Sequence, residues 1–302
     1  MTHTPVQNPL RVLLWSHPRS LSTVFTKCIS YVDNIQIINE PYSTALTTGP
    51  EKKTQYQWSE GLESLMESAS ATENIKGHTW NDTDCSYQWV KDTLEAEYPG
   101  KKIIFCKDHI SGIIDNFDKI PHGYQHTFLI RNPTKYYISL RKLLVKNFLP
   151  PGVSPEMFQM DAAIAQFRGD TSIYSEMMDF MEYLEVSGEC TGNHVIIDAD
   201  DLQNHPASIV RQYCDAVGMP YGDSLLEWEA GDDIVKKNWY VSQTIMQGNK
   251  LANYYEAAFS STKFRPVEET GSIPDVLPPD VVRLSEKAEP DYRKLYEKRL
   301  VP

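Results

Sequence analysis

Five short runs of apolar and β-branched residues recur along the chain, each bounded by polar or turn-forming residues. This pattern predicts buried β-strands, at residues 11–15, 35–38, 103–106, 127–130 and 194–197. Longer stretches with apolar residues at helical spacing lie between or after these runs, at residues 22–31, 87–98, 135–147 and 206–217. Because strands that alternate with helices favour crossover connections, we expect an α/β fold whose central parallel sheet is flanked by helices.

The rest of the chain adds helices to this frame. Residues 154–187 begin with Ser154-Pro155 and are rich in apolar residues, so they predict helices interrupted near Gly169. After residue 220 the periodicity weakens, several prolines follow, and a charged helix is expected at the C-terminus. Repeats, low-complexity tracts and convincing linkers are absent from the sequence. We therefore expect one domain over residues 1–302, with helical additions at about 150–190 and in the C-terminal region.

Composition narrows the classes of protein to which the chain can belong. Its 302 residues carry a formal net charge of -12, which argues against a nucleic-acid partner or a membrane-surface partner. Any anionic ligand must then be held by a few local cations. The five cysteines are widely spaced and form no CxxC pair, and no apolar run approaches the roughly 20 residues that cross a bilayer. We expect free thiols and a cytoplasmic location, because the N-terminus also lacks an export signal.

A short polar stretch, SHPRSLST at residues 16–23, follows the first apolar run directly. A helix that starts at the carboxyl end of a parallel strand presents unpaired N–H groups and a positive dipole end. Arg19 adds a permanent cation, and Ser20, Ser22 and Thr23 add hydroxyl groups. The stretch is typical of a phosphate-binding loop, although it lacks the glycines and lysine of GxxxxGK[ST]. A serine-capped helix with a solvated arginine is the alternative.

A second signal comes from TFLIRNPTKYYISLRK, residues 127–142. The apolar run ends at Ile130, Arg131 follows, Asn132-Pro133 can cap a helix, and Ser139 lies about two turns along it. Arg131 and Ser139 are expected to converge on another phosphate at the same edge of the sheet.

Together, PRSxST after the first strand and RNPxxxxxS at a later strand-to-helix junction resemble the sulfotransferases that use 3′-phosphoadenosine 5′-phosphosulfate (PAPS). The resemblance implies their P-loop NTPase-like fold, PAPS as cosubstrate and 3′-phosphoadenosine 5′-phosphate (PAP) as product. It implies that the first loop, Arg19, Ser20, Leu21, Ser22 and Thr23, binds the 5′-phosphosulfate. It also implies that Arg131 and Ser139 bind the 3′-phosphate.

The resemblance extends to HVIIDADDLQNHPASIVRQYCDAVGMPY at residues 194–221 and so spans most of the chain. Many cytosolic members have lysine at Arg19 and glycine at Leu21, so this chain resembles a PRSxST branch that includes proteins named after aminotransferases. The C-terminal region resembles the family weakly. There Lys236 or Lys237 would cover the adenine, with solvated lysines as the alternative.

Two residues are candidates for the base that deprotonates the acceptor. Lys107 and His109 end the third predicted strand and point the same way if the chain stays extended. They resemble the Lys-x-His of cytosolic members, where histidine is the base and lysine assists, and an imidazole pKa of about 6.5 suits that role. Glu40, after the second strand, resembles the glutamate base of carbohydrate and protein sulfotransferases. We favour His109 and leave Glu40 open as the base, with Arg19 neutralising charge on the transferred group.

The sequence therefore predicts a sulfotransferase that acts on a hydroxyl or amine of a small organic acceptor. A nucleotide-dependent kinase of small molecules and a catalytically silent PAP-binding protein are the alternatives. No metal site is expected, because Pro121 and Gly123 make a helix improbable around His122 and His126. The acceptor and the oligomeric state do not follow from the sequence.

Overall fold

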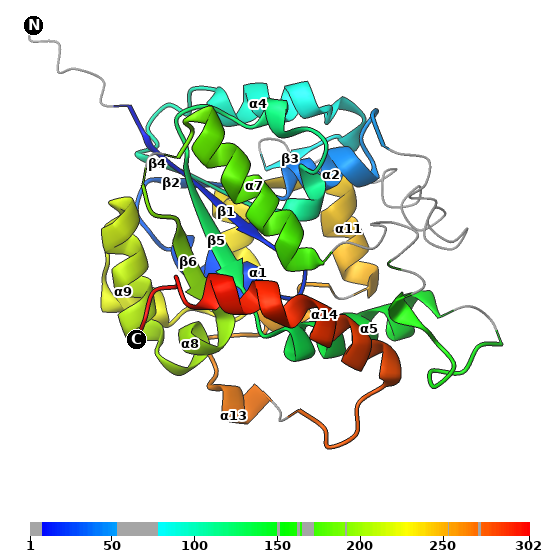
Figure 1. Cartoon of the computed structure of the whole chain (residues 1–302). Helices are drawn as coiled ribbons and strands as arrows, with labels where there is room; N and C mark the ends of the chain where they lie inside the picture. The colour runs from blue at the N-terminus through cyan, green and yellow to red at the C-terminus, as the bar shows by residue number, and fades with distance from the viewer. Residues whose placement is uncertain are drawn as a thin grey trace, which may run out of the picture.

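Seven parallel strands form one sheet in the computed structural model, which describes residues 8–52, 78–149, 152–161, 164, 172–190, 192–252, 254–270 and 273–302 (Figure 1). The strand order is β3-β7-β2-β4-β1-β5-β6, and every pairing is parallel. Their bounds are β1 Leu10–Ser16, β2 Ile35–Asn39, β3 Thr79–Trp80, β4 Ile103–His109, β5 Gln125–Ile130, β6 Val195–Asp198 and β7 Trp239–Ser242. The five predicted strands and the parallel α/β architecture are confirmed. The strands β3 and β7 were not predicted, because they are short and lie where the periodicity is weak.

Helices cover the sheet and connect its strands. Among the described residues, four 3₁₀ segments occupy Asp82–Asp84, Ile110–Gly112, Phe117–Lys119 and Asp223–Leu226. The α-helices are α1 Ser22–Ile29, α2 Pro41–Thr47, α4 Tyr87–Glu95, α5 Pro133–Phe148, α7 Ile173–Ser187, α8 Ala199–Asn204, α9 Pro206–Val217, α10 Asp233–Asn238, α11 Gln243–Ala252, α12 Glu256–Phe259, α13 Val267–Thr270 and α14 Pro279–Tyr296. The four helices predicted by spacing are all present.

Both faces of the sheet are buried, as its parallel pairing requires. Along β1 the side chains alternate between two apolar clusters. Leu13 and Trp15 pack in the cluster that includes residues of α4, α7 and α14, whereas Val12 and Leu14 pack in the cluster that includes residues of α1 and α9. In the view of Figure 1, α7 and α14 cross in front of the sheet. The core therefore lies in two layers, with β1 near the middle of the sheet between β4 and β5.

Local chemistry explains the starts and ends of the predicted helices. The Asn132 side chain accepts a hydrogen bond of 3.2 Å from the Lys135 amide, and Pro133 occupies the first turn of α5. Helix α9 begins at Pro206 and ends at Val217, because Gly218 adopts the left-handed conformation at its C-terminus. The cap at Asn132 and Pro133 is the one that the sequence indicated.

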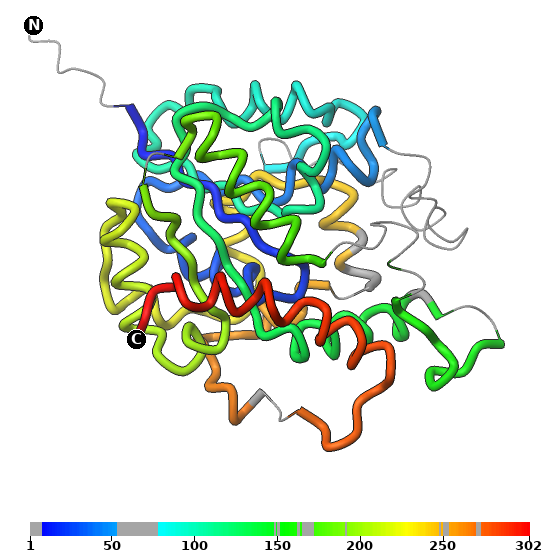
Figure 2. Tube along the Cα trace, in the orientation of Figure 1, coloured from blue at the N-terminus to red at the C-terminus, as the bar shows by residue number. Residues whose placement is uncertain are grey.

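The C-terminal helix α14 packs along α5 and α7 and carries Pro290 inside it. Beyond it the chain returns to the sheet, where the Leu300 amide donates to the Ile196 carbonyl at 2.8 Å. Figure 2 shows this last segment, in red, ending beside α9. The expected C-terminal helix is confirmed, and α7 confirms part of the expected helical addition. The interruption near Gly169 lies outside the described residues.

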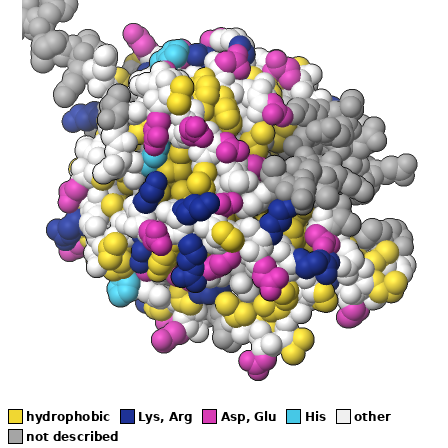
Figure 3. Space-filling view, in the orientation of Figure 1, with side chains coloured by type: hydrophobic (Ala, Val, Ile, Leu, Met, Phe, Trp, Pro, Cys, Tyr) yellow, Lys and Arg dark blue, Asp and Glu magenta, His cyan; other side chains and the backbone are white. Residues whose placement is uncertain are grey.

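All five cysteines are free thiols. On the face shown in Figure 3, basic side chains are interspersed with acidic ones. Two ion pairs join α8 to other parts of the chain, Lys135 with Asp200 and Arg299 with Asp201, each at 2.6 Å.

Among the described residues, no helix combines the length and the apolar character needed to span a membrane. Within the same ranges, no group of three or more His, Cys, Asp or Glu side chains is arranged to hold a metal ion.

Candidate active site

The carboxyl ends of the central strands meet at one edge of the sheet. Ser16, the last residue of β1, lies opposite His109 at the end of β4, and Asn39 at the end of β2 lies opposite Lys107. On the other side of β1, the end of β5 leads into Arg131. Open parallel sheets bind ligands at this edge, where the strand order diverges on either side of a strand.

The first predicted motif forms a loop from β1 into α1. Arg19 and Leu21 both have left-handed backbone, with φ of 68° and 69°, and α1 begins at Ser22. Left-handed residues in a turn direct successive backbone N–H groups toward a concave side, as in anion-binding nests. Bulky residues adopt this conformation at a cost of about 1–3 kcal/mol each. The loop thus has the backbone shape of an anion site without using glycine.

Arg131 meets this loop directly. Its Nη1 donates a hydrogen bond of 2.6 Å to the Arg19 carbonyl oxygen, and the Arg19 Nε donates to Ser139 Oγ at 3.1 Å. Burial lowers the pKa of both arginines, and the charge of Arg131 lowers the pKa of Arg19 further. Within the described ranges, neither guanidinium forms an ion pair with a carboxylate. Asp200 and Asp198 lie close enough to Arg131 to favour its charged form, but neither pairs with it directly. Two adjacent buried cations without a direct carboxylate partner favour an anionic ligand.

Unsatisfied polar atoms at the same place fit such a ligand. Ser20 Oγ and Arg131 Nε are buried and have no hydrogen-bond partner among the described residues. Buried polar groups are normally paired, and an unpaired one is destabilising. A phosphorylated anion would supply acceptor oxygens to both donors, so the residues present fit the nucleotide that the motifs imply.

A cavity of about 540 Å³ opens beside this loop. Its wall includes most of the predicted site residues, namely Arg19, Leu21, Ser22, Thr23, Glu40, His109, Arg131 and Ser139. Ser20 and Lys107 are fully buried and are not among the wall residues. The two predicted phosphate motifs and both candidate bases therefore border one space.

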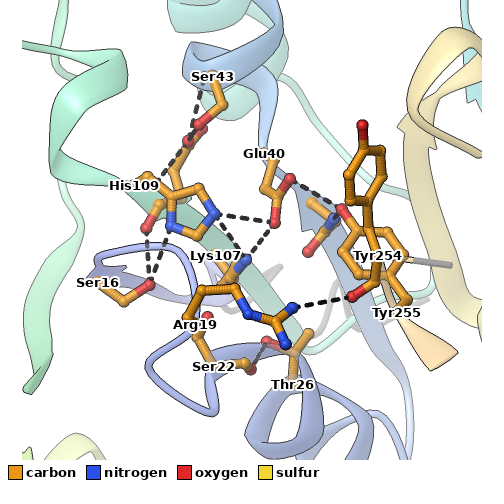
Figure 4. A network of polar contacts seen from close by, with 12 residues as sticks. Ser16, Arg19, Ser22, Thr26, Glu40, Ser43, Lys107, His109, Tyr254 and Tyr255 are labelled. Carbon is orange, nitrogen blue, oxygen red and sulfur yellow. Dashed lines mark hydrogen bonds and ion pairs between the residues drawn. The ribbon is translucent and has the colours of Figure 1, made fainter. Parts of the chain in front are cut away.

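Both candidate bases belong to one polar cluster (Figure 4). Lys107 Nζ donates a hydrogen bond to Glu40 Oε1, and His109 Nε2 lies 3.2 Å from the same oxygen. Lys107 Nζ is also 3.4 Å from His109 Nε2. The prediction that Lys107 and His109 point the same way is confirmed. Glu40 joins them from the start of α2, where its own backbone is left-handed with φ of 61°.

The charge of Glu40 is set by its two basic neighbours. Burial alone would raise the pKa of its carboxyl group, but Lys107 and His109 outweigh burial and hold that pKa well below its ordinary value. Glu40 is therefore an anion throughout the physiological range. Its Oε1 faces Lys107 and His109, and its Oε2 accepts a hydrogen bond of 2.8 Å from the Tyr255 hydroxyl.

The other ring nitrogen of His109 faces Ser16. His109 Nδ1 lies 3.3 Å from Ser16 Oγ, and Ser16 Oγ lies 3.4 Å from the Asp108 carbonyl oxygen. When the Ser16 hydroxyl hydrogen points to that carbonyl, which only accepts, Oγ can accept from Nδ1–H. Nε2 then faces Glu40 and can take up a proton. In the imidazolium form each ring nitrogen would have an oxygen acceptor, Ser16 Oγ at Nδ1 and Glu40 Oε1 at Nε2.

Asp108 holds the backbone around this cluster in place. Its carboxylate accepts hydrogen bonds from the amides of Tyr42, Ser43 and His109 and from the Ser43 hydroxyl, at 2.6, 3.1, 2.7 and 2.6 Å. Burial raises the pKa of Asp108 to about 7, even though these donors favour its ionised form. Asp108 is fully buried, so it orients the start of α2 and the backbone of His109 and does not face water.

Several wall residues were not assigned to the site from the sequence, and most of them come from the region with weak periodicity. Lys263, Phe264 and Arg265 line the cavity, and so do Gln203, Tyr254 and Tyr255. The Tyr254 carbonyl accepts from Arg19 Nη1 at 3.3 Å. By contrast, Lys236 and Lys237 are exposed and are not among the wall residues, and Lys236 pairs with Asp232 at 2.7 Å. The only hint in the sequence was the basic pair around Phe264.

A buried lysine ties this late segment to the phosphate loop. Lys27 lies on α1 and is fully buried. Its Nζ donates to three carbonyl oxygens, those of Ala258, Phe259 and Ser261, each at 3.1 Å. Burial lowers the pKa of Lys27. Helix α1 therefore carries phosphate-loop residues at its start and anchors the segment leading to Lys263 at its end.

Comparison with known proteins gives an independent indication of the family. A family model described as a sulfotransferase domain matches residues 188–297. This range lies outside the two phosphate-binding motifs but includes residues 194–221, and it supports the resemblance to sulfotransferases. The matched range includes the late wall residues, such as Tyr255 and Arg265.

Two curated relatives come from Arabidopsis thaliana. Branched-chain-amino-acid aminotransferase-like protein 2 is 26% identical over 271 residues, and the corresponding protein 1 is 25% identical over 269 residues. Each match covers 87% of this chain and 40% of the relative, so the chain spans about two fifths of the length of these relatives.

Two solved structures are similar over most of the chain. The sulfotransferase domain from the curacin biosynthetic pathway has a TM-score of 0.47 at 15% identity, covering 94% of this chain and 98% of its own. Mouse sulfotransferase SULT7A1, complexed with PAP, has a TM-score of 0.45 at 14% identity, and the match covers 95% of this chain and 87% of SULT7A1.

Proposed function

We propose that this chain is a sulfotransferase that moves a sulfuryl group from PAPS to a hydroxyl or amine of a small organic acceptor. One observation carries the proposal. The Arg19 loop and Arg131 meet at the wall of a cavity that also contains Glu40 and His109. A binding site for a doubly anionic nucleotide and a proton acceptor thus share one space. The sulfotransferase-domain match in the C-terminal part of the chain supports the same reaction.

The nucleotide would lie along the basic part of the wall, where it supplies an activated sulfuryl group. The loop from Arg19 to Thr23 would hold the 5′-phosphosulfate, and Arg131 with Ser139 would hold the 3′-phosphate. Lys263 and Arg265 add two cations to this wall, and Phe264 adds an aromatic ring. These four cations satisfy the requirement that a chain of net charge -12 bind an anion through local charges.

His109 would accept the acceptor's proton at Nε2 as the new S–O bond forms and the bond to the phosphate oxygen breaks. Glu40 would stabilise the resulting imidazolium through Oε1, and Ser16 would hold the Nδ1–H. Glu40 itself is a weaker base, because Lys107 and His109 lower its pKa. Lys107 and Arg19 would offset negative charge on the transferred group.

The proposal also covers the domain organisation, the location and the partners of the protein. One domain would act in the cytoplasm on a small-molecule acceptor, without a nucleic-acid or membrane partner and without a metal. Free thiols and the mixed charges of the surface in Figure 3 support this setting.

Nucleotide binding is the first test. The expected result is that PAP raises the melting temperature of the protein several degrees more than ATP or AMP at equal concentration. Arg131→Met should abolish the difference, whereas Arg211→Met, at an exposed arginine that is not among the wall residues, should preserve it. Equal shifts for PAP, AMP and ATP would contradict the proposal.

Transfer is the second test. Cell extract incubated with the protein and sulfur-labelled PAPS should yield a labelled small molecule by mass spectrometry, and yield should fall in His109→Ala. Tight PAP binding without transfer to a broad acceptor panel would identify a silent binding protein. Magnesium-dependent turnover of ATP would identify a kinase.

A further inference from the structure

A tyrosine far along the chain holds the carboxylate beside His109. Tyr255 follows α11 and is only 7% exposed. Its hydroxyl donates to Glu40 Oε2 at 2.8 Å, and the Asn39 side-chain amide lies 3.3 Å from the same hydroxyl (Figure 4). Asn39 ends β2, directly before Glu40. The phenol therefore links the late segment of the chain to the start of α2.

The direction of these hydrogen bonds follows from the charges. An ionised carboxylate only accepts, so the phenolic hydrogen must point to Glu40. The lone pairs of the phenol then accept from the Asn39 amide. Burial and the neighbouring Glu40 raise the pKa of Tyr255 well above its ordinary value, so this donor stays protonated.

The backbone of Tyr255 is fixed as firmly as its side chain. Its amide donates to Asn249 Oδ1 at 2.6 Å, and its ring lies 5.7 Å from that of Phe259. Tyr255 is thus a rigid donor, whereas Glu40 has rotatable side-chain bonds and reaches His109 only through Oε1. With both oxygens held, the carboxylate has one orientation. Without the phenol, Oε2 would be unpaired in a buried place, and the group would gain freedom to turn away from His109.

We propose that Tyr255 is a positioning residue for sulfuryl transfer, acting through Glu40 on the proton acceptor His109. This inference rests on the proposed function. Tyr255 would affect the transfer step more than nucleotide binding, because the nearby contact to the phosphate loop is made by the carbonyl of Tyr254, which a side-chain change at 255 leaves in place.

The test compares Tyr255→Phe with Tyr213→Phe, which also removes a buried hydroxyl. The Tyr213 hydroxyl lies 3.0 Å from Thr127 Oγ1, and neither Tyr213 nor Thr127 belongs to the cavity wall. Tyr255→Phe should lower kcat by about 10-fold to 100-fold, the range of one hydrogen bond to a charged group. The KM for PAPS and the melting-temperature shift caused by PAP should stay within about twofold of wild type. Tyr213→Phe should leave kcat unchanged.

A double-variant cycle separates positioning from a general structural role. In a Glu40→Gln background, Tyr255→Phe should have little further effect on kcat, since the group on which it acts is already lost. Equal losses in both backgrounds would overturn the inference. If Tyr255→Phe does not fold, Asn39→Ala takes its place with a smaller expected loss that also vanishes in Glu40→Gln.

The outcomes also distinguish this inference from the proposed function. Wild-type protein that neither binds PAP nor transfers sulfate would refute the function. Wild-type protein that transfers sulfate, with a Tyr255→Phe variant of equal kcat, would refute only the role of Tyr255.

Discussion

The guanidinium of Arg131 donates a hydrogen bond to the main-chain carbonyl of Arg19, at 2.6 Å and across 112 residues of sequence. The loop after β1 and the loop after β5 are therefore one binding surface. The contact also orients Arg131, because its Nη1 is held by the backbone while its Nε stays without a partner among the described residues. A ligand oxygen that reaches Nε would also reach the phosphate loop.

Replacing Arg131 should weaken PAP binding without unfolding the protein. Arg131→Met should lose about 1.5–3 kcal/mol of binding free energy, the range for a hydrogen bond to a charged group. Arg131→Lys should recover only part of this loss, because an ammonium lacks the fork that bridges Arg19 and the ligand. Titration calorimetry at fixed salt measures both values. Affinity in Arg131→Met equal to wild type would rule out the assigned role.

The proton acceptor can be identified by comparing two variants. His109→Ala should lower kcat by about 10²-fold to 10⁴-fold, the usual contribution of a general base. Glu40→Gln should lower kcat less, because it removes the charge that stabilises the imidazolium but not the base itself. Both variants should still bind PAP. A larger loss in Glu40→Gln than in His109→Ala would make Glu40 the base.

Lys27 should affect the affinity for the nucleotide indirectly, by anchoring the segment that leads to Lys263. Lys27→Met fills similar space but leaves three carbonyl oxygens without their shared donor. We expect the free energy of unfolding to fall by about 1–3 kcal/mol and the KM for PAPS to rise. The KM for the acceptor should change less, because the anchored segment leads to Lys263 and Arg265. Urea denaturation and steady-state kinetics measure these effects, and an unchanged KM for PAPS would confine Lys27 to stability.

His126 should make stability depend on pH. Trp15 Nε1 donates to His126 Nδ1 at 3.0 Å, and burial lowers the pKa of His126 to about 3. In the unfolded chain its pKa is about 6.5, so its contribution is complete above that pH and is lost as pH falls toward 3. Between pH 7 and pH 5 the stability advantage of wild type over His126→Gln should therefore shrink by about 2 kcal/mol. An advantage that stays constant with pH would show that His126 titrates normally.

Much of the fold followed from the sequence because the central strands are buried on both faces. Continuous apolar runs such as Val12–Trp15 have few alternatives to a parallel strand, and the Asn-Pro cap of α5 marks its helix start. The short strands β3 and β7 escaped prediction because two to four residues carry too little periodicity. Their pairing depends on neighbours that are distant in sequence.

The site was predictable where its residues follow a strand directly. Arg19, Glu40, His109 and Arg131 all lie at the end of a strand or within three residues of it, so the parallel arrangement brings them to one edge. Tyr255 and Lys27 were not predictable. Tyr255 follows no predicted strand, and its partner Glu40 lies 215 residues away. Lys27 occupies a helix position where a charged residue usually faces solvent.

The left-handed backbone at Arg19, Leu21 and Glu40 places three unfavourable conformations at the rim of one cavity. The surrounding sheet holds these residues in shapes that short peptides of the same sequence would rarely adopt. A glycine at position 21 should therefore make the folded chain more robust to heat and its loop less well defined. Selection for thermal stability and selection for catalytic rate would then favour different residues at these positions.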